Sequence, residues 1–169
     1  MSWELSSSSD PRALDIVDGV GLHMGAGPHY SRRTPGSRTF TGVGQEIVLV
    51  TDTLDAAWAV VRQKTPARRG SGGSRGRTGV ADPSVRYLWR NMMFRNLSGK
   101  RSSTLIKEAV AATYTHWVER YGFLPDERLR TEIGIGQVNS SNPGYCYKCA
   151  GWTDGHVVRG KLYLYAPVR

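Results

Sequence analysis

The apolar positions in the first half of the chain predict a β-hairpin. Residues 45–51 (QEIVLVT) and 56–63 (AAWAVVRQ) are rich in β-branched and aromatic side chains, and the turn-forming residues TDTLD lie between them. Residues 1–26 contain a shorter apolar run and are either a poorly determined leader or a first helix. Five glycines and repeated arginines in residues 67–82 (ARRGSGGSRGRTGVAD) predict a flexible loop.

The second half of the chain begins with a strand pattern followed by a helix pattern. Residues 85–97 (VRYLWRNMMFRNL) are apolar and aromatic with interspersed arginines, which predicts a strand in the middle of the sheet. Apolar side chains then recur every three to four positions over residues 104–121, which predicts a helix. Ser102 or Ser103 suits its N-cap, and Gly122 suits the position after its last turn.

Two further strands complete the expected sheet. Residues 129–135 (LRTEIGI) predict a strand that pairs in parallel with residues 85–97, because a helix connects them. Residues 157–168 (VVRGKLYLYAPV) alternate leucine and tyrosine and predict a last strand. Between them, residues 134–152 contain a polar turn and a short helical turn that Pro143 can begin. The fold class expected is α/β of a mixed α+β kind, with a split mixed sheet, a central βαβ unit and flanking helices.

Length and charge limit the function classes. The 169 residues suit one domain, and 23 Lys and Arg against 14 Asp and Glu give a formal net charge of +9. This charge favours an anionic partner such as nucleic acid, although a basic protein without such a ligand has the same composition. No stretch approaches the length of an apolar membrane span and no secretion signal is evident, so we expect a cytoplasmic protein that does not associate with membranes.

Cys146 and Cys149 are the two cysteines of the chain, and they form a single CxxC pair. We expect two small side chains packed in a turn, with a redox or metal-binding role as the alternative. The four histidines show no paired spacing that would complete a zinc site.

Three segments carry a resemblance to a known family. The order of hairpin, βαβ unit, short helix and final strand resembles acyltransferases of the GNAT superfamily. GPHYSRRTPGSRTF (27–40), YLWRNMMFRNL followed by SGKRSS (87–103), and SSNPGYCYKCAGW (140–152) look like the Mom family of bacteriophage DNA-modification proteins. The resemblance covers roughly residues 27–165 and implies one GNAT-like domain over residues 27–169.

The resemblance implies transfer of a small acyl-derived group to the exocyclic amine of adenine in double-stranded DNA, which protects phage DNA from restriction. The donor would be acyl-coenzyme A or a related acyl donor. The residues expected to bind this cofactor are those of the turn after the central strand and of the turn before the short helix: Asn96, Ser98, Gly99, Ser102, Ser103, Asn142 and Gly144. The residues expected at the catalytic centre are His29, Tyr30, Ser31, Glu132 and Tyr147.

The chemistry of these catalytic candidates leaves alternatives open. An adenine amine is a poor nucleophile, so attack needs a proton acceptor and a stabilised oxyanion. His29 suits a base or an exposed loop, and Glu132 suits a catalytic carboxylate or one paired with Arg130. Tyr147 suits an acid for the leaving thiolate or an aromatic of the core beside Trp152.

Some of these side chains, and two further aromatic residues, are also candidates for stacking on the adenine base or for binding a metal ion. His29 and Ser31 share one face of an extended segment, whereas Tyr30 faces the other way and either stacks on a base or joins the core. An extruded adenine could also stack on Trp89 or Tyr145. A metal ion bound by His29 and Glu132 is compatible with their chemistry but is not assigned.

DNA contact is expected from two basic segments. They contain Arg32, Arg33 and Arg38, and then Arg62, Lys64, Arg68, Arg69, Arg75 and Arg77. Six engaged charges would give a slope of about 5 for log affinity against log salt. Alternatives to DNA modification are an acetyltransferase acting on a small amine, a protein or another base, and a non-enzymatic basic module that binds nucleic acid.

Overall fold

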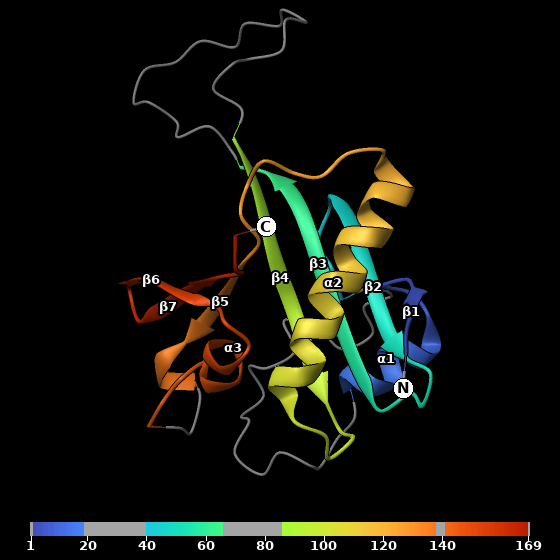
Figure 1. Cartoon of the computed structure of the whole chain (residues 1–169), viewed down its shortest axis with the longest axis horizontal. Coiled ribbons are helices and arrows are strands. Elements are labelled where there is room, and N and C mark those ends of the chain that lie inside the picture. Colours follow the sequence, from blue (N-terminus) through green and yellow to red (C-terminus); the bar gives the residue numbers. More distant parts are fainter. Residues whose placement is uncertain (1, 19–39, 66–85, 138–140, 169) are drawn as a thin grey trace, which may run out of the picture.

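The computed structural model describes residues 2–18, 40–65, 86–137 and 141–168. These residues form one seven-stranded mixed sheet with the strand order β1-β2-β3-β4-β5-β7-β6 (Figure 1). The elements are β1 (Trp3–Ser6), α1 (Pro11–Asp18), β2 (Gln45–Thr51), β3 (Ala56–Lys64), β4 (Tyr87–Asn96), α2 (Ser102–Tyr121), β5 (Arg130–Gly134), the 3-10 turn η1 (Ile135–Gln137), α3 (Tyr145–Cys149), β6 (Thr153–Val158) and β7 (Lys161–Tyr165). The expected mixed α/β class is confirmed.

The predicted hairpin is confirmed as β2 and β3, which pair antiparallel with Val48 opposite Ala59. The segment before it contains the helix α1, which confirms the alternative of a first helix in residues 1–26, and the strand β1, which the sequence did not indicate. β1 pairs antiparallel with β2, and α1 begins with Pro11 after Asp10, whose carboxylate accepts a hydrogen bond from the Arg12 N–H at 2.9 Å. Asp before Pro is a favourable helix start, because the side chain satisfies a free N–H and proline needs no partner there.

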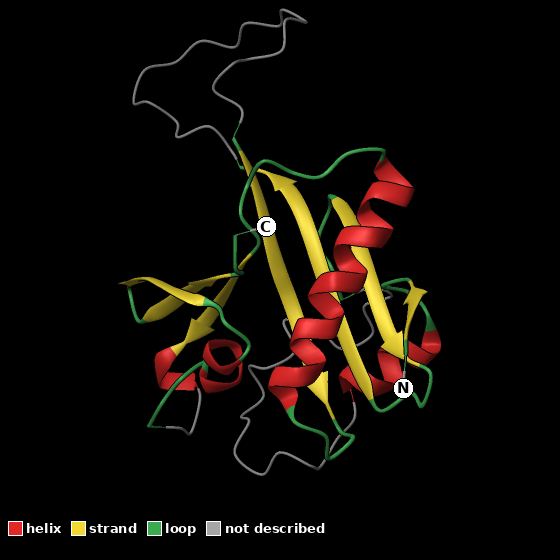
Figure 2. Cartoon of the chain, viewed as in Figure 1, coloured by secondary structure: helices red, strands yellow, loops and turns green. Residues whose placement is uncertain are grey.

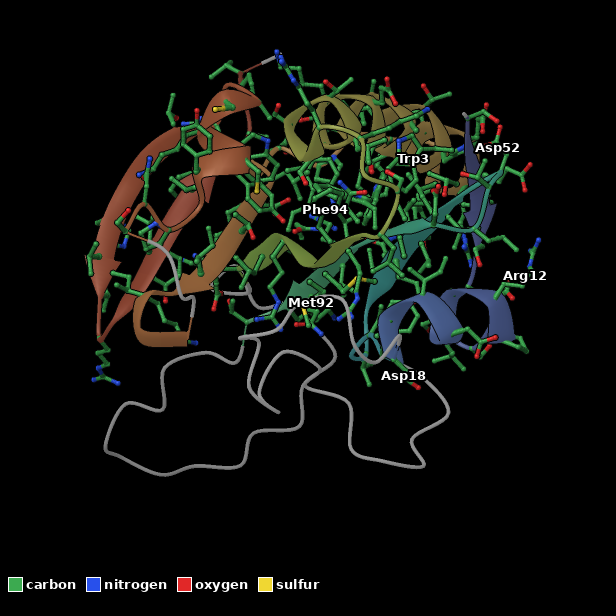
Figure 3. The ribbon with its side chains drawn as sticks, turned by 90° about the horizontal axis from the view of Figure 1, so that it is seen from below. Trp3, Arg12, Asp18, Asp52, Met92 and Phe94 are labelled. Carbon is green, nitrogen blue, oxygen red and sulfur yellow. The ribbon has the colours of Figure 1, made fainter. Side chains whose placement is uncertain are left out.

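The two faces of the sheet are covered by different helices (Figure 3). On the α2 side, Ile47, Trp58 and Trp89 belong to a large buried cluster that also contains Trp117 of α2. On the α1 side, Val48 and other small residues of β2 and β3 pack against Ala13 and Ile16 of α1. Figure 3 shows Phe94 on the α2 side of β4 and Met92 on the α1 side.

The predicted βαβ unit is confirmed, with β4 in the middle of the sheet and parallel to β5. α2 begins at Ser102, two residues before the predicted start, and its N-cap is Arg101 without a side-chain hydrogen bond. The expectation of a serine N-cap is therefore wrong, and the Ser102 hydroxyl instead lies 3.0 Å from Asn96 Nδ2. The helix ends as predicted at Gly122, which has φ 78° and donates its N–H to the Val118 carbonyl.

The C-terminal region departs from the prediction of one strand over residues 157–168. It forms an antiparallel hairpin of β6 and β7, which lies beside β5 and away from the long strands β2 to β4 (Figure 2). Arg159 and Gly160 form its turn with φ 49° and 73°. Two consecutive positive φ values match a tight hairpin turn, and an Arg-Gly pair is a weaker signal for that turn than Asn-Gly.

Candidate active site

The candidate site begins where β4 and β5 separate. β4 pairs with β5 only at Arg90–Arg130 and Asn91–Thr131 within the described residues. At the same point β4 contains a β-bulge, because Val60 of β3 lies opposite Asn91 whereas Ala59 lies opposite Met93. A bulge adds an unpaired residue and bends the strand, which accounts for the divergence of β4 from β5.

Asn91 connects the elements at this bulge, and it is not among the residues predicted from the sequence. Its side chain is almost fully buried, and Nδ2 donates to the carbonyl oxygens of Ala59 at 2.9 Å and Met93 at 2.8 Å. Its Oδ1 accepts from the Tyr147 hydroxyl at 2.7 Å and lies 3.5 Å from the Thr131 hydroxyl. The amide therefore binds β3, β4, β5 and α3 together. No local feature of the sequence marks Asn91 for this role, since residues 87–96 also contain Asn96 and two arginines.

Tyr147 lies on the α2 side of the sheet, on the short helix that the sequence predicted. Its ring makes edge contacts with Trp152 at 5.0 Å and Phe94 at 6.3 Å between centroids. The ring is 8% exposed, and its hydroxyl donates to Asn91. These contacts confirm the alternative of a core aromatic beside Trp152. An acid role requires the hydroxyl to exchange Asn91 for a leaving thiolate.

Glu132 lies on the opposite side of the sheet from Tyr147. Side chains alternate along β5, and Thr131 and Ile133 take the α2 side, where Ile133 approaches Gly144. Glu132 instead forms ion pairs with Arg130 at 3.0 Å and Lys161 at 3.3 Å. Glu132 and Tyr147 were both expected at the catalytic centre, but the structure places their side chains on different faces of the sheet.

The surroundings of Glu132 weaken it as a base. Burial raises the pKa of Glu132, but the charges of Arg130, Lys161 and Arg90 outweigh burial, so its pKa lies below the ordinary value. A carboxylate stabilised in its ionised form takes up a proton less readily. The alternative of a carboxylate paired with Arg130 is confirmed.

The turn between β4 and α2 is organised by Asn96. Its Oδ1 accepts hydrogen bonds from the Ser98 N–H at 3.0 Å and the Ser98 hydroxyl at 2.7 Å. Its Nδ2 lies 2.8 Å from the Lys100 carbonyl oxygen and 3.0 Å from the Ser102 hydroxyl. Gly99 has φ 70° and Ser103 lies in the first turn of α2. The expected cofactor-binding residues of this turn therefore lie together.

The second group of expected cofactor-binding residues precedes α3. Asn142 accepts a hydrogen bond from Lys148 Nζ at 3.1 Å, and its carbonyl oxygen accepts the Tyr145 N–H. Gly144 has φ 75°, and a Cβ there would lie 2.6 Å from Ile133 Cδ1. Pro143 precedes α3 by two residues and does not begin it as predicted, because Gly144 takes the cap position. The absence of a side chain at Gly144 thus allows the start of α3 to pack closely against Ile133 of β5.

The two cysteines lie on α3 as free thiols. Burial raises the pKa of Cys146, whereas Cys149 is exposed. A hydrogen bond with Cys149 raises the pKa of the exposed Tyr145. The expectation of two side chains in a packed turn holds for Cys146 and is wrong for Cys149.

Several predicted residues lie outside the described part of the chain. They are His29, Tyr30, Ser31, Arg32, Arg33, Arg38, Arg68, Arg69, Arg75 and Arg77. Lys64 is described and exposed at the end of β3. Arg62 forms hydrogen bonds to both Glu127 carboxylate oxygens at 3.0 and 3.1 Å, so its guanidinium is held by a carboxylate of the protein. Trp89 is fully buried against Trp117 and offers no surface to a base.

Over the described ranges, no three His, Cys, Asp or Glu side chains gather as a metal site, and no helix is long and apolar enough to cross a membrane. No protein-family model, curated protein or solved structure matches the chain.

Proposed function

We propose that this chain transfers a small acyl-derived group from a thioester donor to the exocyclic amine of adenine in DNA, as the resemblance to the Mom family and GNAT acyltransferases implies. The observation that carries the proposal is the separation of β4 from β5 at a bulge that adjoins the Tyr147 hydroxyl. Separated parallel strands leave backbone edges that can pair with the amides of an extended donor arm.

The proposed donor would extend from the β4–α2 turn towards α3. The ordered turn around Asn96 precedes a 20-residue helix, whose N-terminus attracts anionic groups. Lys100 and Arg101 add positive charge to this end of the helix. The Tyr147 hydroxyl would lie near the sulfur and supply a proton to the leaving thiolate.

In this proposal His29 is the base that removes a proton from the adenine amine. A near-neutral imidazole is suited to accept that proton, and the ion-paired Glu132 is not. Of the two groups that the sequence offered, the proposal thus keeps His29 as the base and leaves Glu132 as an ion-paired carboxylate.

A non-enzymatic nucleic-acid-binding module is the second candidate. It is favoured by the fact that the Tyr147 hydroxyl and the Glu132 carboxylate are both held by other protein groups. Such a module would bind nucleic acid through its excess of basic side chains, without chemical turnover.

Mass spectrometry of nucleosides from cells that express the protein tests the proposal. DNA from cells with the native chain should contain a new adduct on deoxyadenosine, and His29→Ala and Tyr147→Phe should reduce it at least tenfold. Tyr114→Phe removes a hydroxyl from α2 and is the matched control, with the adduct retained. Absence of any adduct at full expression of folded protein would favour the binding module.

A further inference from the structure

The side of β4 to β7 that faces away from α2 combines cations with aromatic rings. Arg90, Arg130 and Lys161 all form ion pairs with Glu132, at 3.7, 3.0 and 3.3 Å. Three positive charges thus share one negative charge, which leaves this group at +2. Lys161 keeps 43% of its side chain exposed and Arg130 keeps 24%. The group retains charge that can attract an anion from solvent.

Aromatic rings lie directly beside these cations because of the strand register. Tyr163 of β7 is opposite Glu132, and Tyr165 is opposite Arg130. The Arg130 guanidinium lies 5.1 Å from the centre of the Tyr163 ring. The Arg128 guanidinium lies 5.2 Å from the Tyr165 ring and donates to the Thr153 hydroxyl on β6. Cations and rings therefore alternate across neighbouring strands.

The outermost ring of this surface is His156 of β6. It stacks on Tyr163 with 5.3 Å between centroids and 23° between planes, and it is exposed. The bulge in β6 between Asp154 and Val157 brings His156 to this side. Gly155 allows β6 to lie close to Tyr165, because a Cβ there would be 2.5 Å from the Tyr165 ring. The backbone of β6 therefore places the His156 ring against Tyr163 and leaves it exposed to solvent.

We propose that this surface, formed by Arg90, Arg128, Arg130, His156, Lys161, Tyr163 and Tyr165, binds a nucleic acid strand. Its phosphates contact Arg130 and Lys161, and one of its bases stacks on His156. Alternating rings and cations distinguish this partner from an acidic peptide, which needs the charges but not the flat rings. The inference rests on the proposed function in that DNA is the substrate, and it places DNA contact outside the two basic segments expected from the sequence.

Charge removal tests the phosphate contacts. Arg130→Gln with Lys161→Gln should weaken binding of a fluorescein-labelled DNA duplex about tenfold and lower the slope of log Kd against log salt by roughly 1.8, two phosphates at about 0.9 each. Lys107→Gln with Arg120→Gln removes the same charge from exposed positions on α2 and is the matched control. Equal weakening by both pairs would overturn the proposal, because it would show an effect of net charge alone.

Ring removal tests the stacking and uses a residue whose loss should not disturb folding. His156→Ala should weaken binding of a labelled single strand roughly five- to tenfold and leave binding of inorganic polyphosphate unchanged. Unchanged binding of the single strand, or an equal loss for polyphosphate, would contradict base stacking. Circular dichroism of each variant verifies that the sheet is retained. Lys161→Gln alone, at a half-exposed position, serves if the double variant unfolds.

These assays separate this inference from the proposed function. Binding is measured without turnover, so the surface variants can weaken DNA binding even if no adenosine adduct ever forms. In that case the surface stands and the transferase proposal fails. An adduct that forms at the native level in all surface variants, with unchanged binding, would leave the transferase proposal in place and overturn the surface.

Discussion

Asn91 compensates at a single position for a break in the sheet. The bulge at Met92 interrupts the regular pairing of β3 and β4, and the Asn91 amide donates to carbonyl oxygens of both strands. Because Nδ2 is used in this way, Oδ1 must be the acceptor for the Tyr147 hydroxyl. The same side chain thus fixes both the bend in β4 and the position of the candidate acid.

Substitution of Asn91 should show this coupling. Asn91→Leu leaves two buried carbonyl oxygens without their donor, and we expect a loss of about 3 kcal/mol in the free energy of unfolding. Tyr147→Phe removes one hydrogen bond and should cost about 1 kcal/mol. In the double variant the losses should fall short of their sum by about 1 kcal/mol, measured by urea unfolding. Additive losses would mean that the two side chains act independently.

Individual site residues were only partly predictable from the sequence. Tyr147 was correctly placed on a short helix, because the proline, glycine and aromatic residues around it are strong local signals. Its partner Asn91 was missed, since the bulge depends on pairing between β3 and β4 and leaves no local signature. For Glu132 the sequence left a catalytic carboxylate and a pair with Arg130 open, because one residue of register decides which face of the strand a side chain takes.

Among the elements, α3 depends on close packing at its N-terminal glycine. Gly144→Ala would bring a Cβ to 2.6 Å from Ile133 and 2.8 Å from Leu164, so we expect a loss of about 3 kcal/mol. Gly99→Ala is the matched control, because Gly99 has a similar φ of 70° and no neighbour within 4 Å. It should cost about 1 kcal/mol from backbone strain alone. Equal melting temperatures of the two variants would refute the packing argument.

The start of α1 gives a stability that depends on pH. Hydrogen bonds from Arg12 and Ser6 lower the pKa of Asp10 to about 2, from 3.8. A lowered pKa stabilises the fold above 3.8, and this contribution is lost as the pH falls towards 2. Asp10→Asn keeps a good N-cap without the charge, so its deficit in unfolding free energy should vanish over that interval. Asp15→Asn removes one exposed carboxylate from the same helix and is the control.

Element types were more predictable than their connections. β2, β3, β4, α2 and β5 agree with the predicted segments to within two residues at every end, because their apolar patterns are long and regular. The last predicted strand proved to be a hairpin, since the Arg159–Gly160 turn carries a weak sequence signal. β1 was missed because Trp3–Ser6 is too short to show a period.

At the scale of the whole molecule, the N-terminal elements belong to the same sheet as the candidate site. Ile16 of α1 is 4% exposed and packs on the face of β2 and β3 opposite to α2. Ile16→Ala should therefore cost roughly 2–4 kcal/mol. The buried Trp58, Trp89 and Trp117 report the α2 face by their fluorescence.

If the sheet unfolds as one unit, Ile16→Ala must also shift the unfolding transition that is followed by tryptophan fluorescence. This shift should equal the shift of the transition followed by circular dichroism. Asp15→Ala changes an exposed residue of α1 and should leave both transitions within about 0.5 kcal/mol of the native chain. A tryptophan transition that does not respond to Ile16→Ala would show that α1 is a separable leader. Coincident shifts would instead mean that the α1 face and the α2 face of the sheet unfold together.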